Sequence, residues 1–112
     1  MYGDNLEVYR MKAELCKAFS DPKRLMIVDI LSRGEATVNN VSKTAGLQQA
    51  VVSRNLAILR NRGVVKTRRQ GTRIHYSLTD EKIVQACNLV HDIMLGQIEA
   101  QKNLTEGLTA RE

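Results

Sequence analysis

Acidic residues are missing from a long stretch in the middle of this chain. Between Ala36 and Thr79 there is no aspartate or glutamate, although 12 of the 112 residues are acidic. Eight of the 17 lysines and arginines lie in the same interval, which we call the acid-free interval: Lys43, Arg54, Arg60, Arg62, Lys66, Arg68, Arg69 and Arg73. The net charge of +5 is therefore concentrated there. This segregation indicates a negatively charged partner.

Aromatic residues, cysteines and long apolar runs are also scarce. With no tryptophan, one phenylalanine and three tyrosines, binding of single strands by base stacking is disfavoured. Two cysteines are too few for a disulfide scaffold. There is neither an 18-residue apolar run nor a signal-peptide pattern at the start, so we expect a cytoplasmic protein with no membrane partner. The length predicts a single domain, 1–112.

The first 62 residues show helical periodicity. We expect a first helix over 4–20, capped by Asp4 or Asn5, and a second helix that begins at Asp21-Pro22 and ends at Gly34. In the second helix an apolar face is formed by Leu25, Val28 and Leu31. Over 37–62, a short helix capped by Thr37 and ended by Gly46 precedes a helix that begins near Gln48 or Gln49 and stops at Gly63. Two short helices joined by a glycine-containing turn predict a helix-turn-helix.

The pattern changes period over 64–78, which predicts a β-hairpin with strands 64–69 and 72–78 around Gln70-Gly71. A last helix, over 80–102, is expected after a Thr79 or Asp80 cap, with Asp80 and Glu81 in its first turn. Its apolar stripe is Ile83, Cys87, Val90, Met94 and Ile98, and residues 100–112 are expected to be frayed.

A helix-turn-helix followed by a hairpin is a winged helix, here mainly α with a small β-hairpin wing. The basic helix and hairpin tip predict binding to double-stranded DNA, since recognition-helix side chains enter the major groove and arginines contact phosphates. The expected DNA-binding residues are Gln48, Gln49, Ala50, Ser53, Arg54, Lys43, Arg60, Arg68, Arg69 and Arg73. For any one arginine, the alternative is a solvated surface residue.

Three segments together carry a family resemblance: LCKAFSDPKRLMIVDIL, LQQAVVSRNLAILRNRGVV and RRQGTRIHYSL. Over about residues 10–98 the chain resembles the ArsR/SmtB family of winged-helix repressors. Gln48, Ala50 and Val51 stand where the family usually has hydroxyl residues, which alters the helix cap and the expected operator contacts. The resemblance implies a homodimer formed by the first and last helices, a palindromic operator, and repression relieved by an effector.

The metal sites common in that family are not expected here. The stretch EATVNNVSK at the third helix contains no Cys or His. On the last helix Asp80 matches the first ligand, but Lys82, Ile93 and Gly96 occupy the other three positions. We therefore predict no inherited zinc site and no cofactor.

The remaining candidate sensor residues are Cys16 and Cys87, which lie on the two helices expected to form the dimer interface. Oxidation or a polysulfide bridge between them is one interpretation, and a soft metal or metalloid held with His91 is another. Plain packing is the third, because cysteine is often a buried small hydrophobe.

Other classes of function fit less well. No phosphate-binding glycine loop, nucleophile–histidine–acid pattern or zinc-hydrolase motif is present, so an enzyme is not expected. A DNA-binding dimer without a sensor, and a winged helix used for protein–protein assembly, stay open as alternatives.

Overall fold

The fold is described from a computed structural model that covers the backbone of residues 5–110 and the side chains of residues 5–108. Five helices and one two-stranded antiparallel sheet follow in chain order: α1 (Leu6–Lys17), α2 (Pro22–Leu31), α3 (Val38–Ala45), α4 (Gln49–Asn61), β1 (Val65–Gln70), β2 (Arg73–Leu78) and α5 (Lys82–Ala110). The predicted winged helix-turn-helix is confirmed. The residues up to Glu81 form one compact unit, and α5 belongs to a second.

Local capping explains where the helices begin. The side chains of Asn5, Asp21 and Thr37 accept hydrogen bonds from the amides of Glu7, Lys23 and Asn40, at 3.1, 2.8 and 3.2 Å. Such bonds satisfy first-turn amides that have no partner within the helix. These three predicted caps are confirmed, whereas the alternative Asp4 lies outside the described residues.

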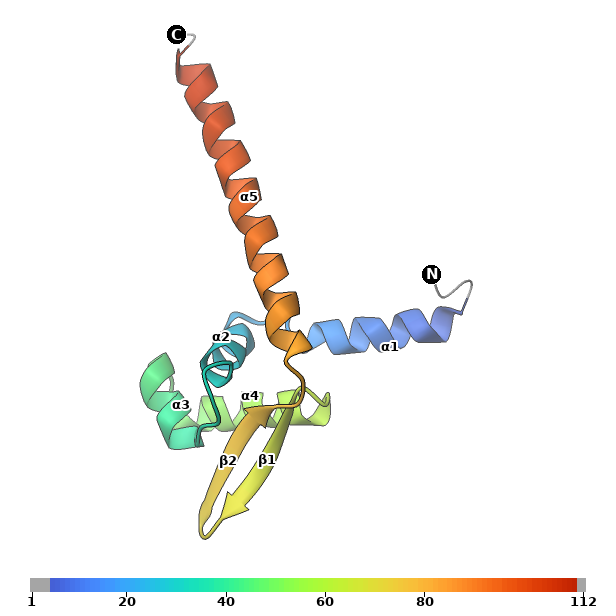
Figure 1. Ribbon diagram of the computed structural model, residues 1–112, viewed down its shortest axis with the longest axis vertical. Coiled ribbons are helices and arrows are strands. Elements are labelled where there is room, and N and C mark those ends of the chain that lie inside the picture. Colours follow the sequence, from blue (N-terminus) through green and yellow to red (C-terminus); the bar gives the residue numbers. More distant parts are fainter. Residues whose placement is uncertain (1–4, 111–112) are drawn as a thin grey trace. The chain divides into compact units, whose positions relative to one another are not determined.

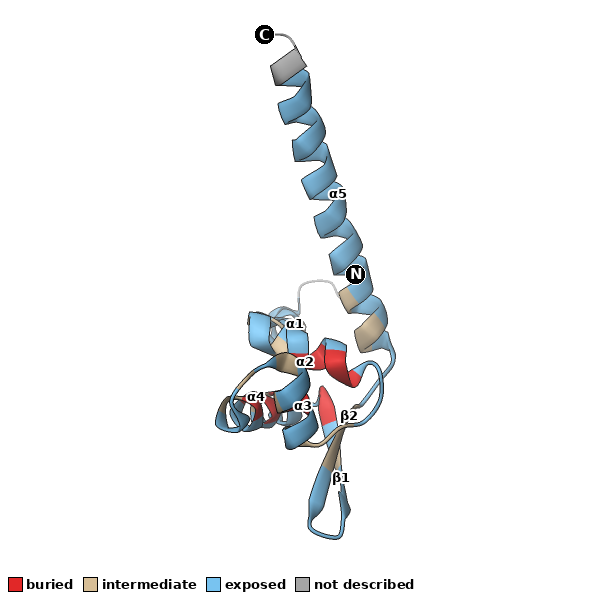
Figure 2. Ribbon diagram, turned by 90° about the vertical axis from the view of Figure 1, so that its left-hand side faces the viewer, coloured by how far each residue is buried: buried red, intermediate tan, exposed pale blue. Residues whose placement is uncertain are grey.

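The core of the first unit is aliphatic and lies among α2, α3, α4 and the start of β1 (Figure 2). Its largest fully buried side chains are Ile27, Leu56, Leu59, Val28, Val41, Val52 and Val64. Val28 and Leu31 of the predicted apolar face are buried, whereas Leu25 is 44% exposed. Ile27 and Ile30 complete the buried face of α2.

The turn between α3 and α4 is fixed by Gly46, whose φ of 69° is left-handed. The amides of Gly46 and Leu47 both donate to the carbonyl of Ser42, at 2.9 and 3.2 Å. Glycine adopts this conformation without steric cost, so the sharp turn between the two helices is encoded locally. By contrast, α2 ends at Leu31, three residues before Gly34, so Gly34 is not its immediate cap as predicted.

The hairpin pairs Val65 with Leu78 at its base and Gln70 with Arg73 at its tip. Its two-residue loop is Gly71-Thr72, one position later than predicted, with positive φ only at Gly71. That combination matches the hairpin turns in which glycine occupies the first central position. A third segment joins the sheet, because Ala36 and Tyr76 exchange two backbone hydrogen bonds of 3.0 and 2.8 Å. The sequence did not predict this bridge.

Helix α5 differs from the prediction at both ends. It begins at Lys82, after both residues expected in its first turn, and the Thr79 hydroxyl donates to the carbonyl of Gly63 at 2.7 Å. At the other end the helix continues to Ala110, so the expectation that residues 100–110 are frayed is wrong. Within this stretch Leu104 and Leu108 continue the apolar stripe. No described helix is long and apolar enough to cross a membrane.

Candidate nucleic-acid interface

All ten residues predicted to contact DNA are exposed. They belong to three neighbouring elements of the first unit, namely α3, α4 with its N-cap, and the hairpin (Figure 1). The acid-free interval runs from the Ala36 bridge to the end of β2, so it contains these elements and nothing else. The ten residues that the sequence predicted as DNA contacts therefore lie on the surface of one structural unit.

The first turn of α4 begins without a side-chain cap. Gln48 is the N-cap residue, and its side chain makes no capping hydrogen bond. The family resemblance predicted an altered cap at this position, and the structure agrees. Gln49, the first helical residue, donates from Nε2 to Oδ1 of Asn39 on α3 at 2.9 Å. Exposed amides and the positive end of the helix dipole favour an anion at this helix start.

The orientation of α4 is fixed by a polar contact at its buried face. Arg24 on α2 donates from Nη1 to Oδ1 of Asn55 at 3.2 Å, and Asn55 is only 4% exposed. The same guanidinium donates to the carbonyls of Ala18 and Lys17, at 2.8 and 3.1 Å. One side chain thus ties α4 to the end of α1.

Sequence reasoning missed this contact. The signal was present, because Asn55 lies three residues after Val52 and four before Leu59, on the face that carries the apolar residues of α4. A polar residue on such a face requires a buried partner.

A second contact, an ion pair, joins α1 to the end of α4. Arg62 is the C-cap residue of α4, and its Nη2 lies 2.8 Å from Oε2 of Glu14. A hydrogen bond from Lys17, followed by the charges of Lys17 and Arg62, lowers the pKa of Glu14 below the ordinary glutamate value. Arg62 was counted in the acid-free interval, but its charge is partly neutralised by an acid from outside it.

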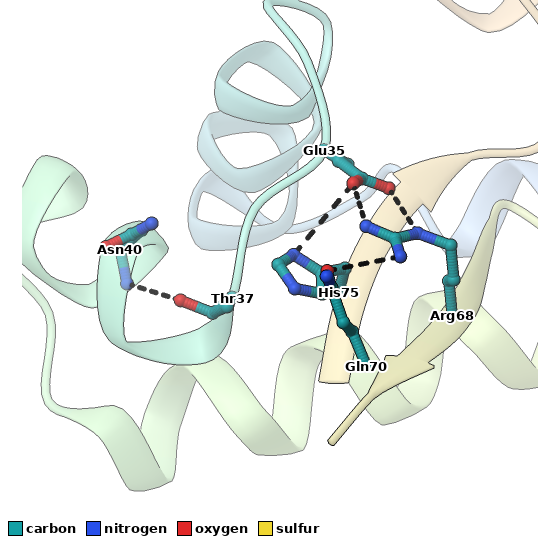
Figure 3. Close-up of polar contacts among 6 residues, drawn as sticks. All are labelled: Glu35, Thr37, Asn40, Arg68, Gln70 and His75. Carbon is teal, nitrogen blue, oxygen red and sulfur yellow. Dashed lines mark hydrogen bonds and ion pairs between the residues drawn. The ribbon is translucent and has the colours of Figure 1, made fainter. Parts of the chain in front are cut away.

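The middle of the wing holds the other cluster of charged groups (Figure 3). Glu35, the last acid before the acid-free interval, receives hydrogen bonds from Nε and Nη2 of Arg68, and Nδ1 of His75 lies 4.0 Å from Oε1 of Glu35. The hydrogen bond from Arg68 lowers the pKa of Glu35, and Glu35 in turn raises the pKa of Arg68. Of the three predicted wing arginines, Arg68 is therefore engaged within the chain.

Comparisons with known proteins agree with this geometry. The family model described as "Bacterial regulatory protein, arsR family" matches residues 21–67. A biofilm growth-associated repressor of Xylella fastidiosa is 39% identical over 85 residues, which cover 76% of this chain and 75% of that protein. The chain belongs to the ArsR family. This family membership, together with the fold, identifies a DNA-binding transcription regulator and not an enzyme.

Solved structures of ArsR-family regulators share the fold. The transcriptional repressor BigR of Xylella fastidiosa superposes with a TM-score of 0.72 at 36% identity, over 83% of this chain and 96% of that one. A homodimeric winged helix-turn-helix DNA-binding domain from Mycobacterium bovis superposes with a TM-score of 0.77 at 29% identity. The match covers 89% of this chain and 95% of that one.

The candidate sensor residues of this ArsR-family chain lie in different units. Cys16 is exposed on α1, Cys87 is half-buried on α5, and neither forms a disulfide within the chain. His91 is exposed on α5. Among residues 5–108, no group of three or more His, Cys, Asp or Glu side chains is arranged to hold a metal ion.

Proposed function

We propose that this protein is a homodimeric repressor that binds a palindromic site in double-stranded DNA through α4 and the wing. The observation that carries this proposal is the exposure of all ten predicted contact residues within one acid-free part of the fold. Gln48, Gln49, Ala50, Ser53 and Arg54 lie at the start of the recognition helix, where side chains reach base edges or nearby phosphates. Lys43, Arg60, Arg69 and Arg73 supply positive charge around them.

The apolar face of α5 supports the proposal that the chain forms a homodimer. Eight residues in steps of four and three share one face along the whole helix, six of them apolar and two of them glutamines: Ile83, Cys87, Val90, Met94, Gln97, Gln101, Leu104 and Leu108. Ile98 of the predicted stripe is adjacent to Gln97. This heptad spacing is typical of helices that pair side by side, and polar residues inside the stripe restrict the register. Val90, Leu104 and Leu108 are 65%, 67% and 58% exposed in the single chain, which a partner helix would cover. Leu6, Tyr9, Met11 and Leu15 leave a comparable apolar surface on α1.

The dimer also fits the expected DNA geometry. Two recognition helices related by a twofold axis reach half-sites one helical turn apart, about 34–36 Å, and require a palindromic operator. Such a regulator acts at the chromosome, so we place it in the cytoplasm and, when bound, at the nucleoid.

An effector that releases the repressor is the finer part of the proposal. Cys16 and Cys87 are the candidate redox or sulfur sensors, because both lie on helices of the proposed interface. A metal or metalloid bound by Cys16, Cys87 and His91 is the alternative for this site. A DNA-binding dimer that is regulated only by its abundance is the alternative without any effector.

The salt dependence of DNA binding tests the central claim. Duplexes selected from a random-sequence pool by the wild-type protein serve as the probe, and affinity is measured by fluorescence anisotropy across a series of KCl concentrations. Each phosphate contact contributes about −0.9 to the slope of log affinity against log salt. Arg69→Gln and Arg73→Gln are each expected to reduce the steepness by about one.

Lys102→Gln is the matched control, because it removes one positive charge from α5, outside the proposed DNA interface. It is expected to leave the slope of log affinity against log salt unchanged. A wild-type protein that selects no duplex, or a slope that is insensitive to both wing variants, would reject the DNA-binding interface. It would favour the protein-assembly alternative instead.

A further inference from the structure

An ion pair reaches across β2 of the wing, from Glu35 to Arg68 on β1. Ala36 pairs with Tyr76 of β2, so Glu35 lies beside the edge of the sheet. His75 pairs with Arg68 in the hairpin register, so both side chains project from the same face of the sheet. The Glu35 carboxylate reaches past His75 on β2 to the Arg68 guanidinium on β1 (Figure 3).

The contact has the geometry of a specific pair rather than of two nearby charges. Nε of Arg68 donates to Oε2 of Glu35 at 3.3 Å, and Nη2 donates to the other carboxylate oxygen. This two-pronged arrangement fixes direction as well as distance. Nη1 of Arg68 also donates to Oε1 of Gln70, at 3.3 Å. All three nitrogens of the guanidinium therefore donate to acceptors inside the chain.

We propose that Glu35 is a positioning residue for DNA binding, and that it holds Arg68 so that the wing keeps a fixed orientation against the helix-turn-helix. Arg68 then acts through Glu35, not as a phosphate contact, and the phosphate contacts of the wing belong to Arg69 and Arg73. The inference rests on the proposed DNA-binding function for its consequence. The anchoring itself is measurable without DNA.

Charge alone predicts the opposite effect of removing Glu35. A carboxylate beside a DNA-binding wing repels phosphates, so its neutralisation would tighten binding if it did nothing else. If Glu35 positions the wing, Glu35→Gln weakens binding, because the wing loses its orientation before it meets the duplex. The sign of the effect therefore separates the two roles.

The decisive experiment combines amide hydrogen exchange with DNA affinity. In Glu35→Gln and in Arg68→Gln, we expect the amides of Ala36 and Tyr76 to exchange at least about twofold faster, because the bridge between them opens more often. The amide of Thr79, which donates to the carbonyl of Val64 at 3.0 Å at the base of the hairpin, is the internal control and keeps its rate. Circular dichroism verifies that each variant is folded.

On the selected duplex, each of the two variants is expected to lower affinity by about two- to fivefold without changing the salt slope. The double variant is expected to lose no more affinity than either single one, since both remove the same contact. The reversed pair, Glu35→Arg with Arg68→Glu, is expected to bind more tightly than Arg68→Glu alone, because only a direct pair is rescued by exchange of its charges.

Several outcomes would overturn this inference. A salt slope reduced by about one in Arg68→Gln would make Arg68 a phosphate contact. Tighter binding by Glu35→Gln, or unchanged exchange at Ala36 and Tyr76, would leave Glu35 without a positioning role. If the wild type binds no duplex while exchange does accelerate, the proposed function fails and the anchoring survives. If Arg69→Gln weakens binding while exchange and affinity in Glu35→Gln stay unchanged, only the anchoring fails.

Discussion

Asn55 on α4 and Arg24 on α2 form a hydrogen bond of 3.2 Å at the buried face of the recognition helix. Asn55 also donates from Nδ2 to the carbonyl of Val51 at 2.9 Å, so both ends of its amide are satisfied. Among residues 5–108, no buried side-chain nitrogen or oxygen lacks a partner. The position of α4, with its predicted DNA-contacting residues, therefore depends on a contact at its buried face.

Replacing Asn55 by alanine is expected to destabilise the protein. The change leaves one donor of Arg24 without its acceptor in a partly buried site, which costs about 1–3 kcal/mol in the free energy of unfolding. Urea unfolding followed by circular dichroism measures the loss. Asn61→Ala, at the exposed end of the same helix, is the control and is expected to change stability by less than about 0.5 kcal/mol. Equal effects of the two substitutions would show that the Arg24 contact contributes nothing specific.

The local signals in the sequence were sufficient for most of the fold. Caps at Asn5, Asp21 and Thr37 and the left-handed turn at Gly46 act within a few residues, so they are readable from the chain. The exposure of the ten predicted contact residues was also predictable, since a run of basic and polar residues on an amphipathic helix faces water.

Contacts between distant residues were not predictable in the same way. Arg24 and Asn55 are 31 positions apart, and Glu35 and Arg68 are 33 apart. Their pairing depends on how α2, α4 and the hairpin pack, which periodicity does not specify. The length of α5 was missed for another reason. Gln97 and Gln101 interrupt the apolar stripe, so the pattern appeared to stop at Ile98 although Leu104 and Leu108 resume it.

The turn of the helix-turn-helix depends on glycine at position 46. Gly46→Ala is expected to destabilise the fold by about 1 kcal/mol, because alanine is strained at a φ of 69° although no atom lies within 4 Å of the added Cβ. Thermal unfolding measures the effect. Gly96→Ala is the matched control: its Cβ also meets nothing within 4 Å, but it lies inside α5, where alanine is the better helix former. The two substitutions are expected to shift stability in opposite directions, and a neutral Gly46→Ala would contradict the strain argument.

The apolar stripe of α5 predicts how the proposed dimer dissociates. Val90→Asp places a charge in the stripe and is expected to shift the protein to monomer at micromolar concentration, as measured by analytical ultracentrifugation. Leu95→Asp is the control and adds the same charge at another exposed residue. Leu95 is 49% exposed in the single chain and Val90 is 65% exposed. Five residues of helix separate the two positions by about 140°, so Leu95 lies off the stripe and its variant stays dimeric. If both variants remain dimeric, α5 does not form the interface.

Acid is expected to remove the contribution of the Glu35–Arg68 pair to stability. The pKa of Glu35 is lowered in the folded chain by the hydrogen bond from Arg68, so the folded state favours the ionised form. Stability gained in this way is present above the ordinary glutamate pKa and is lost as the pH falls through the lowered value.

The difference in unfolding free energy between wild type and Glu35→Gln should therefore be largest near neutral pH and shrink below about pH 5. Urea titrations at several pH values measure this difference. Glu99→Gln, which removes an exposed carboxylate from α5, is the control for the charge change alone. A difference that stays constant with pH would contradict the lowered pKa.

The proposed thiol switch predicts a change of DNA affinity that requires both cysteines. In the dimer, oxidation or polysulfide treatment is expected to link Cys16 and Cys87 and to weaken binding to the selected duplex by at least about tenfold, because a bridge between the interface helices shifts the population away from the DNA-competent arrangement. Fluorescence anisotropy measures binding under reduced, oxidised and polysulfide-treated conditions. Mass spectrometry of the unreduced protein identifies the bridge.

The two single variants separate the three interpretations of these cysteines. Cys16→Ser and Cys87→Ser should each abolish the response and keep the affinity of the reduced wild type, because a bridge needs two sulfur atoms that approach with Cα atoms within about 7 Å. Ser20→Cys is a control that places a thiol four residues after Cys16, beyond the end of α1, and with Cys16→Ser it should not restore the response. If binding is unchanged by oxidant and polysulfide but falls on addition of a thiol-binding metal ion, the metal interpretation gains. If no treatment changes the affinity of the wild type, the cysteines serve only as packing residues. The regulator then acts through its abundance alone.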